Sequence, residues 1–387
     1  MSYTKTDKTI AGAYPRSSRW STLFEADRLS VVYTVFEVDN AGDTGEEEEV
    51  QKGPLVNLIF DSGNCCNRAI WYYHIERLIE LGSSKDSAFR INSAITFDRV
   101  NQGDSAVVNQ MKLGPEYEWK DGARDILEIV RRESQDRASC FWKAGNQTVV
   151  VGHSMGGYEA LCATCMSPQL FVGACLFEPV VWIAEDDWDG FSLIMAKVYA
   201  MLQTEFKDET SYSTYWRTKS FHRSFQERPL QDFLDTDRLV EADGSVRNKT
   251  LKDHMMCNYA GGIAASTFLA PLLKGNPTPS LHVIGAKARW NPARTNSFLQ
   301  NTMPDCEARL VEGAIHSVNC DQADISINLI SETIVSKAIP EILARREKDK
   351  ISANAVAKSS RAAYAARLAS EAVAARLKQV KKAKSKL

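Results

Sequence analysis

The chain has 387 residues, of which 44% are hydrophobic and 25% charged, and its formal net charge is -2. This length suits one large α/β domain with insertions or two ordinary domains. The nearly neutral charge argues against nucleic acid as a partner, and the absence of a run of about 18 apolar residues argues against a transmembrane segment. Nine cysteines without a regular framework, and an N-terminus without an apolar secretory core, predict a reduced intracellular compartment.

Strand-like and helix-like segments alternate through the first half of the chain. Short apolar runs predict strands at 29–37, 54–60, 89–98, 147–152 and 171–179. Apolar residues at helical spacing predict helices at 69–82, 121–133 and 155–166. Such alternation is typical of a parallel sheet with helices on both faces, so we expect an α/β fold.

This alternation stops at residues 182–275, which carry aromatic residues and helical stretches but no clear strand. Strand periodicity resumes at 280–286 and 308–314. The simplest interpretation is a helical cap inserted over the carboxyl edge of the sheet. The predicted organisation is a core made of residues 20–181 and 276–345, with the cap between its two parts.

Residues 346–387 are predicted to form a basic helical tail. From residue 351 onward this tail holds nine Lys or Arg against a single acid, Glu371, and its spaced apolar residues indicate an amphipathic helix. The final three residues match the peroxisomal targeting address that an import receptor reads: Ser385, Lys386 and Leu387. We therefore expect import into the peroxisomal matrix, with this receptor as a partner. For the amphipathic helix, a role at a membrane surface is the alternative.

The stretch GHSMG, from Gly152 to Gly156, is a complete G-x-S-x-G motif between a predicted strand and a predicted helix. The serine of such a motif sits on a strained turn that needs glycine where a β-carbon would clash. The turn lifts the hydroxyl above the sheet, at the positive end of the following helix. We predict that Ser154 is a catalytic nucleophile.

A serine hydroxyl needs a histidine base near neutral pH. Among the six histidines, His316 lies in a loop just after the last predicted strand and satisfies the chain order serine, acid, histidine. We therefore predict that His316 is the base. The other five lie beside the nucleophile, on a helix flank, within an apolar strand or in the predicted cap: His153, His74, His282, His222 and His254.

The third member must be an acid that holds the tautomer of His316 and stabilises its charged form. The loop after the strand at 280–286 is the usual place, but it holds basic residues and no carboxylate. Glu178 ends an earlier strand, at the carboxyl edge where this type of sheet keeps its chemistry. We predict Glu178 as the acid, with Asp305 and Glu307 as alternatives.

An oxyanion hole needs two backbone N–H donors. Met155, directly after the nucleophile, is expected to supply one. The loop after the strand at 54–60 reads DSGNCC, and Gly63 in it permits close approach of the backbone. We predict the N–H of Asn64 as the second donor.

No metal and no cofactor is predicted. Cys162 and Cys165 form a C-x-x-C pattern without a second pair, which is more typical of buried helix cysteines than of zinc ligands. Glycine patterns that cradle phosphates do not follow any predicted strand.

These motifs together resemble the α/β-hydrolases, and within them a fungal group of peroxisomal lipases and acyl-CoA hydrolases, some of toxin biosynthesis. The resemblance covers most of residues 20–345, and it implies that the acid follows the strand after the nucleophile helix, at Glu178. In this group the oxyanion loop begins with a histidine and has a glycine soon after, whereas this chain has Ser62 in place of the histidine and Cys65 near the glycine. The stretches that carry the resemblance are FDRVNQGDSAV, DGARDILEI, VVGHSMGGYEAL, FEPVV and IHSVN, with SKL at the end.

The resulting prediction is a cofactor-independent serine hydrolase that cleaves an ester or acyl-CoA thioester through an acyl-enzyme. The resemblance implies a role in the biosynthesis of a fungal toxin. The alternatives are a lipase or carboxylesterase acting on glycerides, and a non-catalytic protein of the same fold that binds an acyl ligand. An apolar acyl tunnel is expected along the large side chains of the cap: Trp182, Trp188, Phe191, Met195 and Tyr199.

Overall fold

The computed structural model describes residues 2–39 and 53–384. The chain forms two compact units, residues 1–339 and residues 340–387. The second unit begins slightly before the predicted start of the tail at residue 346. Each unit is described by itself.

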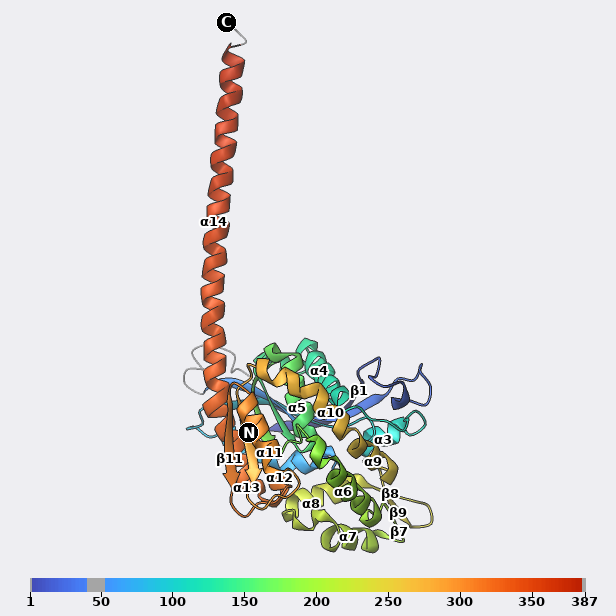
Figure 1. The fold of residues 1–387 in the computed structure, drawn as a ribbon. Coiled ribbons are helices and arrows are strands. Elements are labelled where there is room, and N and C mark those ends of the chain that lie inside the picture. The colour runs from blue at the N-terminus through green and yellow to red at the C-terminus, as the bar shows by residue number, and fades with distance from the viewer. Residues whose placement is uncertain (1, 40–52, 385–387) are drawn as a thin grey trace. The chain divides into compact units, whose positions relative to one another are not determined.

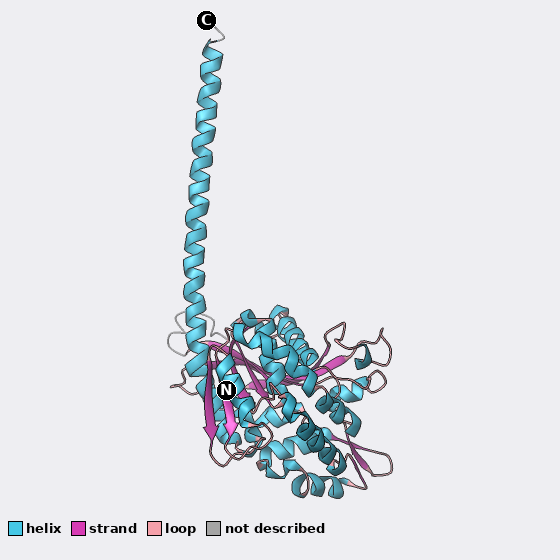
Figure 2. Cartoon of the chain, in the orientation of Figure 1, coloured by secondary structure: helices cyan, strands magenta, loops and turns pink. Residues whose placement is uncertain are grey.

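An eight-stranded sheet with the order β1-β2-β4-β3-β5-β6-β10-β11 forms the centre of the first unit (Figure 1, Figure 2). The strands from β4 to β11 in this order are parallel, β2 is antiparallel to β4, and β1 is antiparallel to β2. The prediction of a mostly parallel sheet is therefore confirmed. The strands are β1 (Tyr3–Ala11), β2 (Ser30–Val38), β3 (Leu55–Asp61), β4 (Arg90–Asp98), β5 (Thr148–His153), β6 (Phe171–Phe177), β10 (Ser280–Gly285) and β11 (Cys306–Val311).

The strand β1 lies outside the range predicted for the core, which began at residue 20. It pairs with β2 along its whole length, from Tyr3 opposite Val38 to Ala11 opposite Ser30. Its sequence, YTKTDKTIA, is largely polar and exposed because the strand forms the edge of the sheet. Pairing of this kind uses backbone groups and leaves little apolar pattern in the sequence.

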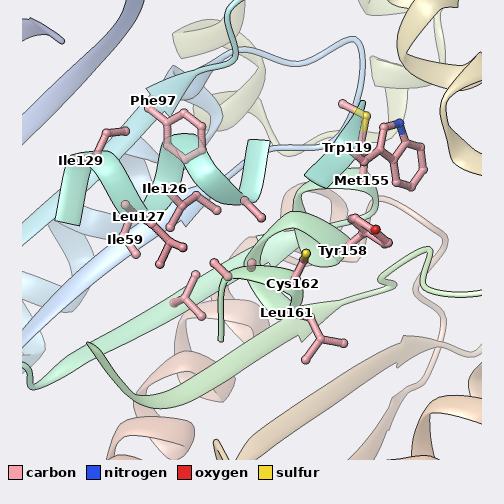
Figure 3. Close-up of a cluster of buried hydrophobic side chains, with 14 of the residues drawn as sticks. Ile59, Phe97, Trp119, Ile126, Leu127, Ile129, Met155, Tyr158, Leu161 and Cys162 are labelled. Carbon is pink, nitrogen blue, oxygen red and sulfur yellow. The ribbon is translucent and has the colours of Figure 1, made fainter. Parts of the chain in front are cut away.

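Helices cover both faces of the sheet. On one face α4 packs against α5, and on the other α2 packs against α13. Part of the core between α4 and α5 is shown in Figure 3, where Ile126 and Leu127 of α4 and Leu161 of α5 are buried. These helices and the smaller ones of the core are α2 (Tyr72–Gly82), α3 (Gly103–Asn109), α4 (Trp119–Gln135), α5 (Met155–Met166), α11 (Ala293–Thr302), α12 (Val318–Asp321) and α13 (Ala323–Thr333).

The insertion between β6 and β10, which we call the cap, holds five α-helices, and α6, α7 and α8 gather on one side of the sheet (Figure 1). It also contains a small sheet with the order β7-β9-β8, so the expectation of no strand in this region is wrong. These strands have two or three residues each, too few for an alternating pattern. The cap elements are α6 (Trp188–Met201), β7 (Glu205–Phe206), α7 (Glu209–Thr218), α8 (Glu227–Asp237), β8 (Arg238–Val240), β9 (Val246–Asn248), α9 (Lys252–Ala260) and α10 (Gly262–Leu269).

One helical stretch of the described residues, Lys252–Gly275, is long and apolar enough by length and composition to cross a membrane. It contains α9 and α10 and packs against the core. The indole of Trp119 donates to the carbonyl of Asn258 at 2.6 Å, and the hydroxyl of Tyr158 donates to the carbonyl of Ala265 at 2.8 Å. These hydrogen bonds tie the stretch to the core, and 33% of its apolar window is buried inside the described protein.

A single long helix, α14 (Ile339–Lys384), makes up the described part of the second unit. The tail therefore contains the helix that its spacing predicts. Near its beginning Ile342 is buried, whereas five large apolar side chains from residue 351 onward are between 47% and 65% exposed: Ile351, Val356, Tyr364, Leu368 and Val373. The predicted targeting residues Ser385, Lys386 and Leu387 lie outside the described residues.

Candidate active site

Ser154 stands on the turn between β5 and α5, with a backbone φ of 55°. A non-glycine residue in this region of φ is strained by roughly 1–3 kcal/mol, and such strain is typical of functional turns. A β-carbon on Gly152 would collide with the carbonyl of Gly156, and one on Gly156 would collide with the carbonyl of Ser62. Both flanking glycines of the motif are thus required by close backbone packing.

The structure brings Ser154, His316 and Glu178 together. The Nε2 atom of His316 lies 2.9 Å from the Oγ atom of Ser154, and its Nδ1 atom lies 3.2 Å from the Oε2 atom of Glu178. Ser154 precedes α5, Glu178 follows β6, and His316 lies in the loop between β11 and α12. With Nδ1–H donating to the carboxylate, Nε2 is free to accept the proton of the serine hydroxyl.

Glu178 is fully buried, and its carboxylate is held by two donors besides the imidazole. The N–H of Gly285 donates to Oε1 at 2.8 Å, and the side-chain amide of Asn291 donates to Oε2 at 3.3 Å and to the Glu178 carbonyl at 3.1 Å. Both donors come from the end of β10 and the loop after it, the usual place for the acid. In this chain that loop holds Glu178 instead of supplying the acid, and no sequence pattern marks Asn291 as its partner.

The alternative acids lie elsewhere. Asp305 precedes β11 and Glu307 is near its beginning, whereas His316 follows the opposite end of that strand. Their carboxylates lie 3.0 Å and 3.5 Å from the ammonium group of Lys337 and are about half exposed. The structure therefore does not bring Asp305 or Glu307 to His316.

Two rings pack directly against the imidazole of His316. The indole of Trp290 stacks on it with a centroid separation of 5.4 Å, and the ring of His153 lies 5.1 Å away. The Nε2 atom of His153 lies 3.0 Å from the carbonyl oxygen of His316, so this ring bonds to the backbone of the loop that carries His316. Burial, together with repulsion from His316, holds the pKa of His153 well below its usual value, and His153 therefore stays neutral.

The segment DSGNCC, residues 61–66, passes close to Ser154. We call it the oxyanion loop because it contains Asn64, the predicted second oxyanion donor. A β-carbon on Gly63 would lie 3.4 Å from the Cβ atom of Ser154 and 2.6 Å from the Nδ1 atom of His153. Met155, the first residue of α5, is anchored in the hydrophobic core. The structure thus brings residues 61–66, which contain Asn64, close to Ser154.

A mostly apolar cavity of about 150 Å³ lies beside the triad. Asn291, which bonds Glu178, and Trp290, which stacks on His316, both line it. Of the cap residues expected to form an acyl tunnel, Trp182 and Phe191 line this cavity. The remaining lining residues are Val180, Ile183, Asp187, Gly190, Ile194, Arg289, Pro292 and Thr295.

Three of the expected tunnel residues do not line this cavity. Trp188 packs against the hydrophobic core, Met195 is buried, and Tyr199 is exposed with the ammonium group of Lys252 over its ring. Among the residues that the structure describes, no group of three or more His, Cys, Asp or Glu side chains could hold a metal ion.

Residues 58–319 match the alpha/beta hydrolase family, and this match covers more than half of the chain. The chain therefore belongs to the alpha/beta hydrolase family, as the sequence motifs, the sheet and the turn at Ser154 predict.

The chain is 29% identical over 350 residues to the peroxisomal membrane protein LPX1 of Saccharomyces cerevisiae, covering 86% of this chain and 87% of that protein. The solved structure of the peroxisomal alpha-beta-hydrolase Lpx1 from the same yeast matches with a TM-score of 0.76 and 27% identity, covering 90% of this chain and 97% of that chain. The type I acyl-CoA thioesterase mpaH of Penicillium roqueforti is 22% identical over 184 residues, covering 47% of this chain and 38% of that protein. The predicted resemblance to fungal peroxisomal hydrolases is confirmed.

Proposed function

We propose that the chain is a serine hydrolase that cleaves an ester or an acyl-CoA thioester through an acyl-enzyme. The observation that carries this proposal is the continuous hydrogen-bond path from Ser154 Oγ through the His316 imidazole to Glu178, with separations of 2.9 Å and 3.2 Å. Backbone N–H groups of Met155 and Asn64 are proposed to bind the oxyanion.

The mechanism follows from these positions. Ser154 Oγ attacks the acyl carbon while His316 Nε2 takes its proton, and the imidazolium then returns that proton to the departing alcohol or thiol. In the second half a water molecule gives one proton to His316 while its oxygen attacks the acyl carbon. The bond from that carbon to Ser154 Oγ then breaks, the imidazolium returns its proton to Oγ, and the acid is released. The buried carboxylate of Glu178 stabilises the imidazolium in both halves.

The cavity supports an acyl substrate. Its lining is dominated by apolar and aromatic side chains such as Trp182, Phe191 and Trp290. A volume of about 150 Å³ accommodates an apolar group roughly the size of benzene, so a short acyl segment fits. The name of mpaH favours a thioester, and the role in toxin biosynthesis stays a prediction.

Peroxisomal localisation is part of the proposal. The yeast relative LPX1 appears in both comparisons, and both of its names place it in the peroxisome. The proposed partner is the import receptor, which would read Ser385, Lys386 and Leu387.

A fluorophosphonate probe tests the nucleophile, because it forms a covalent bond only with an activated serine. We expect labelling of the wild type and none of Ser154→Ala. Ser326→Ala is the matched control, since Ser326 is a buried serine whose hydroxyl donates to the Val318 carbonyl, and we expect it to be labelled like the wild type. A wild type without labelling, or labelling that survives Ser154→Ala, contradicts the proposed mechanism.

Hydrolysis assays with the wild type and Ser154→Ala distinguish the candidate substrate classes. We expect the wild type to hydrolyse short-chain acyl-CoA thioesters and short nitrophenyl esters, and Ser154→Ala to hydrolyse neither. Hydrolysis restricted to long-chain glycerides would contradict the proposed substrate class and favour a lipase.

A further inference from the structure

The side chain of Asn64 is held by four hydrogen bonds. Its Oδ1 atom accepts from the N–H of Cys65 at 3.0 Å, from the amide of Gln102 at 3.1 Å and from the amide of Asn258 at 2.9 Å. Its own amide donates to the carbonyl of Met255 at 2.7 Å. Two of the four partners, Asn258 and Met255, belong to α9 of the cap, so the cap holds this side chain directly.

Asn258 is fully buried and is oriented by the core. Its Oδ1 atom accepts from the side-chain amide of Asn101 at 2.7 Å, and its backbone carbonyl accepts from the indole of Trp119 at 2.6 Å. A flip of its amide would place nitrogen against the Asn101 donor and oxygen against the Asn64 acceptor. The amide N–H of Asn258 is therefore committed to Asn64.

The residue after Asn64 is strained, and the cap holds it as well. Cys65 has a φ of 63°, a conformation that persists in a non-glycine residue only when its surroundings hold it in place. His222 of the cap donates from Nε2 to the Cys65 carbonyl at 3.1 Å. Burial lowers the pKa of His222 to about 3, so this ring stays neutral with its other nitrogen accepting from Ser220.

The core holds the beginning of the same loop. The guanidinium of Arg99 donates to the carbonyl of Ser62 and to the carboxylate of Asp61, the latter at 2.6 Å. Arg99 also donates to Gln102 at 2.8 Å, and Gln102 in turn donates to Asn64. The core therefore fixes residues 61 and 62, whereas the cap contributes to fixing residues 64 and 65.

We propose that Asn258 is a positioning residue for the oxyanion hole. By holding the Asn64 side chain it fixes the direction of the Asn64 N–H, which makes the cap part of the catalytic apparatus as well as a wall of the substrate cavity. This inference rests on the proposed serine hydrolase function. It also gives a physical role to a loop that has Ser62 in place of the histidine, and Cys65 near the glycine, of the hydrolases that the sequence resembles.

Asn258→Ala tests this role through a readout that responds to the oxyanion. We expect kcat to fall by about 10- to 100-fold with KM changed less than about twofold, because outright loss of one oxyanion donor costs roughly 100- to 1000-fold. An acyl trifluoromethyl ketone is the probe. Ser154 Oγ adds to its carbonyl carbon, the serine proton passes to His316, and the carbonyl oxygen becomes an oxyanion.

The inhibition constant of this ketone is expected to rise by the same factor as kcat falls. The affinity for a non-hydrolysable acyl thioether, which forms no oxyanion, should stay within about twofold. Asn258→Asp is the second variant, since it keeps the acceptor for Asn101 and replaces only the donor to Asn64. It should show the same selective loss if Asn258→Ala does not fold.

Asn276→Ala is the matched control. Asn276 is also buried, but its amide donates to Thr164 at 2.9 Å, so we expect unchanged kcat and unchanged ketone binding. Tight ketone binding by the wild type and equally tight binding by the folded Asn258 variants would overturn this inference alone. A wild type that neither turns over substrate nor binds the ketone would overturn both the inference and the proposed function.

Discussion

Glu178 shows how a carboxylate at the end of β6, instead of the usual loop after β10, can reach His316. The strands β6 and β10 are parallel neighbours, with Phe177 opposite Val283. An acid at the end of β6 therefore lies beside the end of β10, and the positive φ of Glu178, 47°, turns the chain at that point. The N–H of Gly285, at the end of β10, donates to the carboxylate.

Replacing Glu178 by glutamine should abolish most of the activity. An amide no longer stabilises the imidazolium, and in the comparable serine-protease substitution kcat falls about 10⁴-fold. We expect a loss of kcat on the order of 10³- to 10⁴-fold for Glu178→Gln, measured by steady-state hydrolysis. Asp305→Asn and Glu307→Gln should retain wild-type kcat, and a large loss in either control would show that the acid is misassigned.

At the scale of single elements, β10 carries an unusual buried group. His282 lies within this strand, and neither of its ring nitrogens has a hydrogen-bond partner in the described part of the chain. Burial lowers its pKa from the usual 6.5 to about 4. The native protein therefore keeps His282 neutral at pH values where the unfolded chain binds a proton.

The sign of the resulting pH effect follows from this difference in pKa. The stability contributed by neutral His282 is fully present above about pH 6.5 and is lost as the pH falls toward 4, because the unfolded state is protonated first. Replacing His282 by leucine removes this loss. We expect His282→Leu to raise the free energy of unfolding by about 2 kcal/mol more at about pH 5 than at about pH 8, measured by denaturant unfolding. A stability difference that does not vary with pH would contradict this explanation.

Two single elements of the cap form hydrogen bonds with a loop of the core. The helix α9 supplies Met255 and Asn258 to the oxyanion loop, and the short helix Phe221–Ser224 supplies His222. Both segments are far from residues 61–66 in sequence. The sequence indicates this insertion only as a cover, but its side chains and backbone also form hydrogen bonds with the loop beside Ser154.

At the scale of the whole molecule, the proposed catalytic groups and the proposed targeting signal belong to different units. Ser154, Glu178 and His316 lie in residues 1–339, whereas the tail belongs to residues 340–387. Changes in the tail should therefore affect import without affecting hydrolysis.

Deletion of Leu387 tests this separation. We expect the purified protein to keep its kcat/KM, while the full chain in cells moves from peroxisomes to the cytosol in imaging and fractionation. Lys382→Ala, which changes the tail upstream of the final tripeptide, should leave the distribution unchanged. Peroxisomal localisation that persists without Leu387 would refute the assignment of the signal.

Sequence patterns predict those features that depend on local chemistry. Alternating periodicities identify most strands of the sheet and the helices around Ser154. Gly152 and Gly156 mark the strained turn, since a β-carbon at either position collides with nearby backbone. His316 follows from its place in chain order. The polar edge strand β1 escapes this reasoning because its stability comes from backbone pairing with β2.

The sequence by itself therefore determined the fold class and the strained turn at Ser154, and it predicted Glu178 and His316 as its partners, because periodicity and glycine placement record burial and backbone shape. Only the tertiary structure decided that Asn291 supports Glu178 and that Asn258 supports Asn64, across 113 and 194 residues of sequence. For a polar side chain in a loop or a cap helix, no sequence pattern identifies its hydrogen-bond partner. Its hydrogen bonds are set by distance in space, and folding alone establishes that distance.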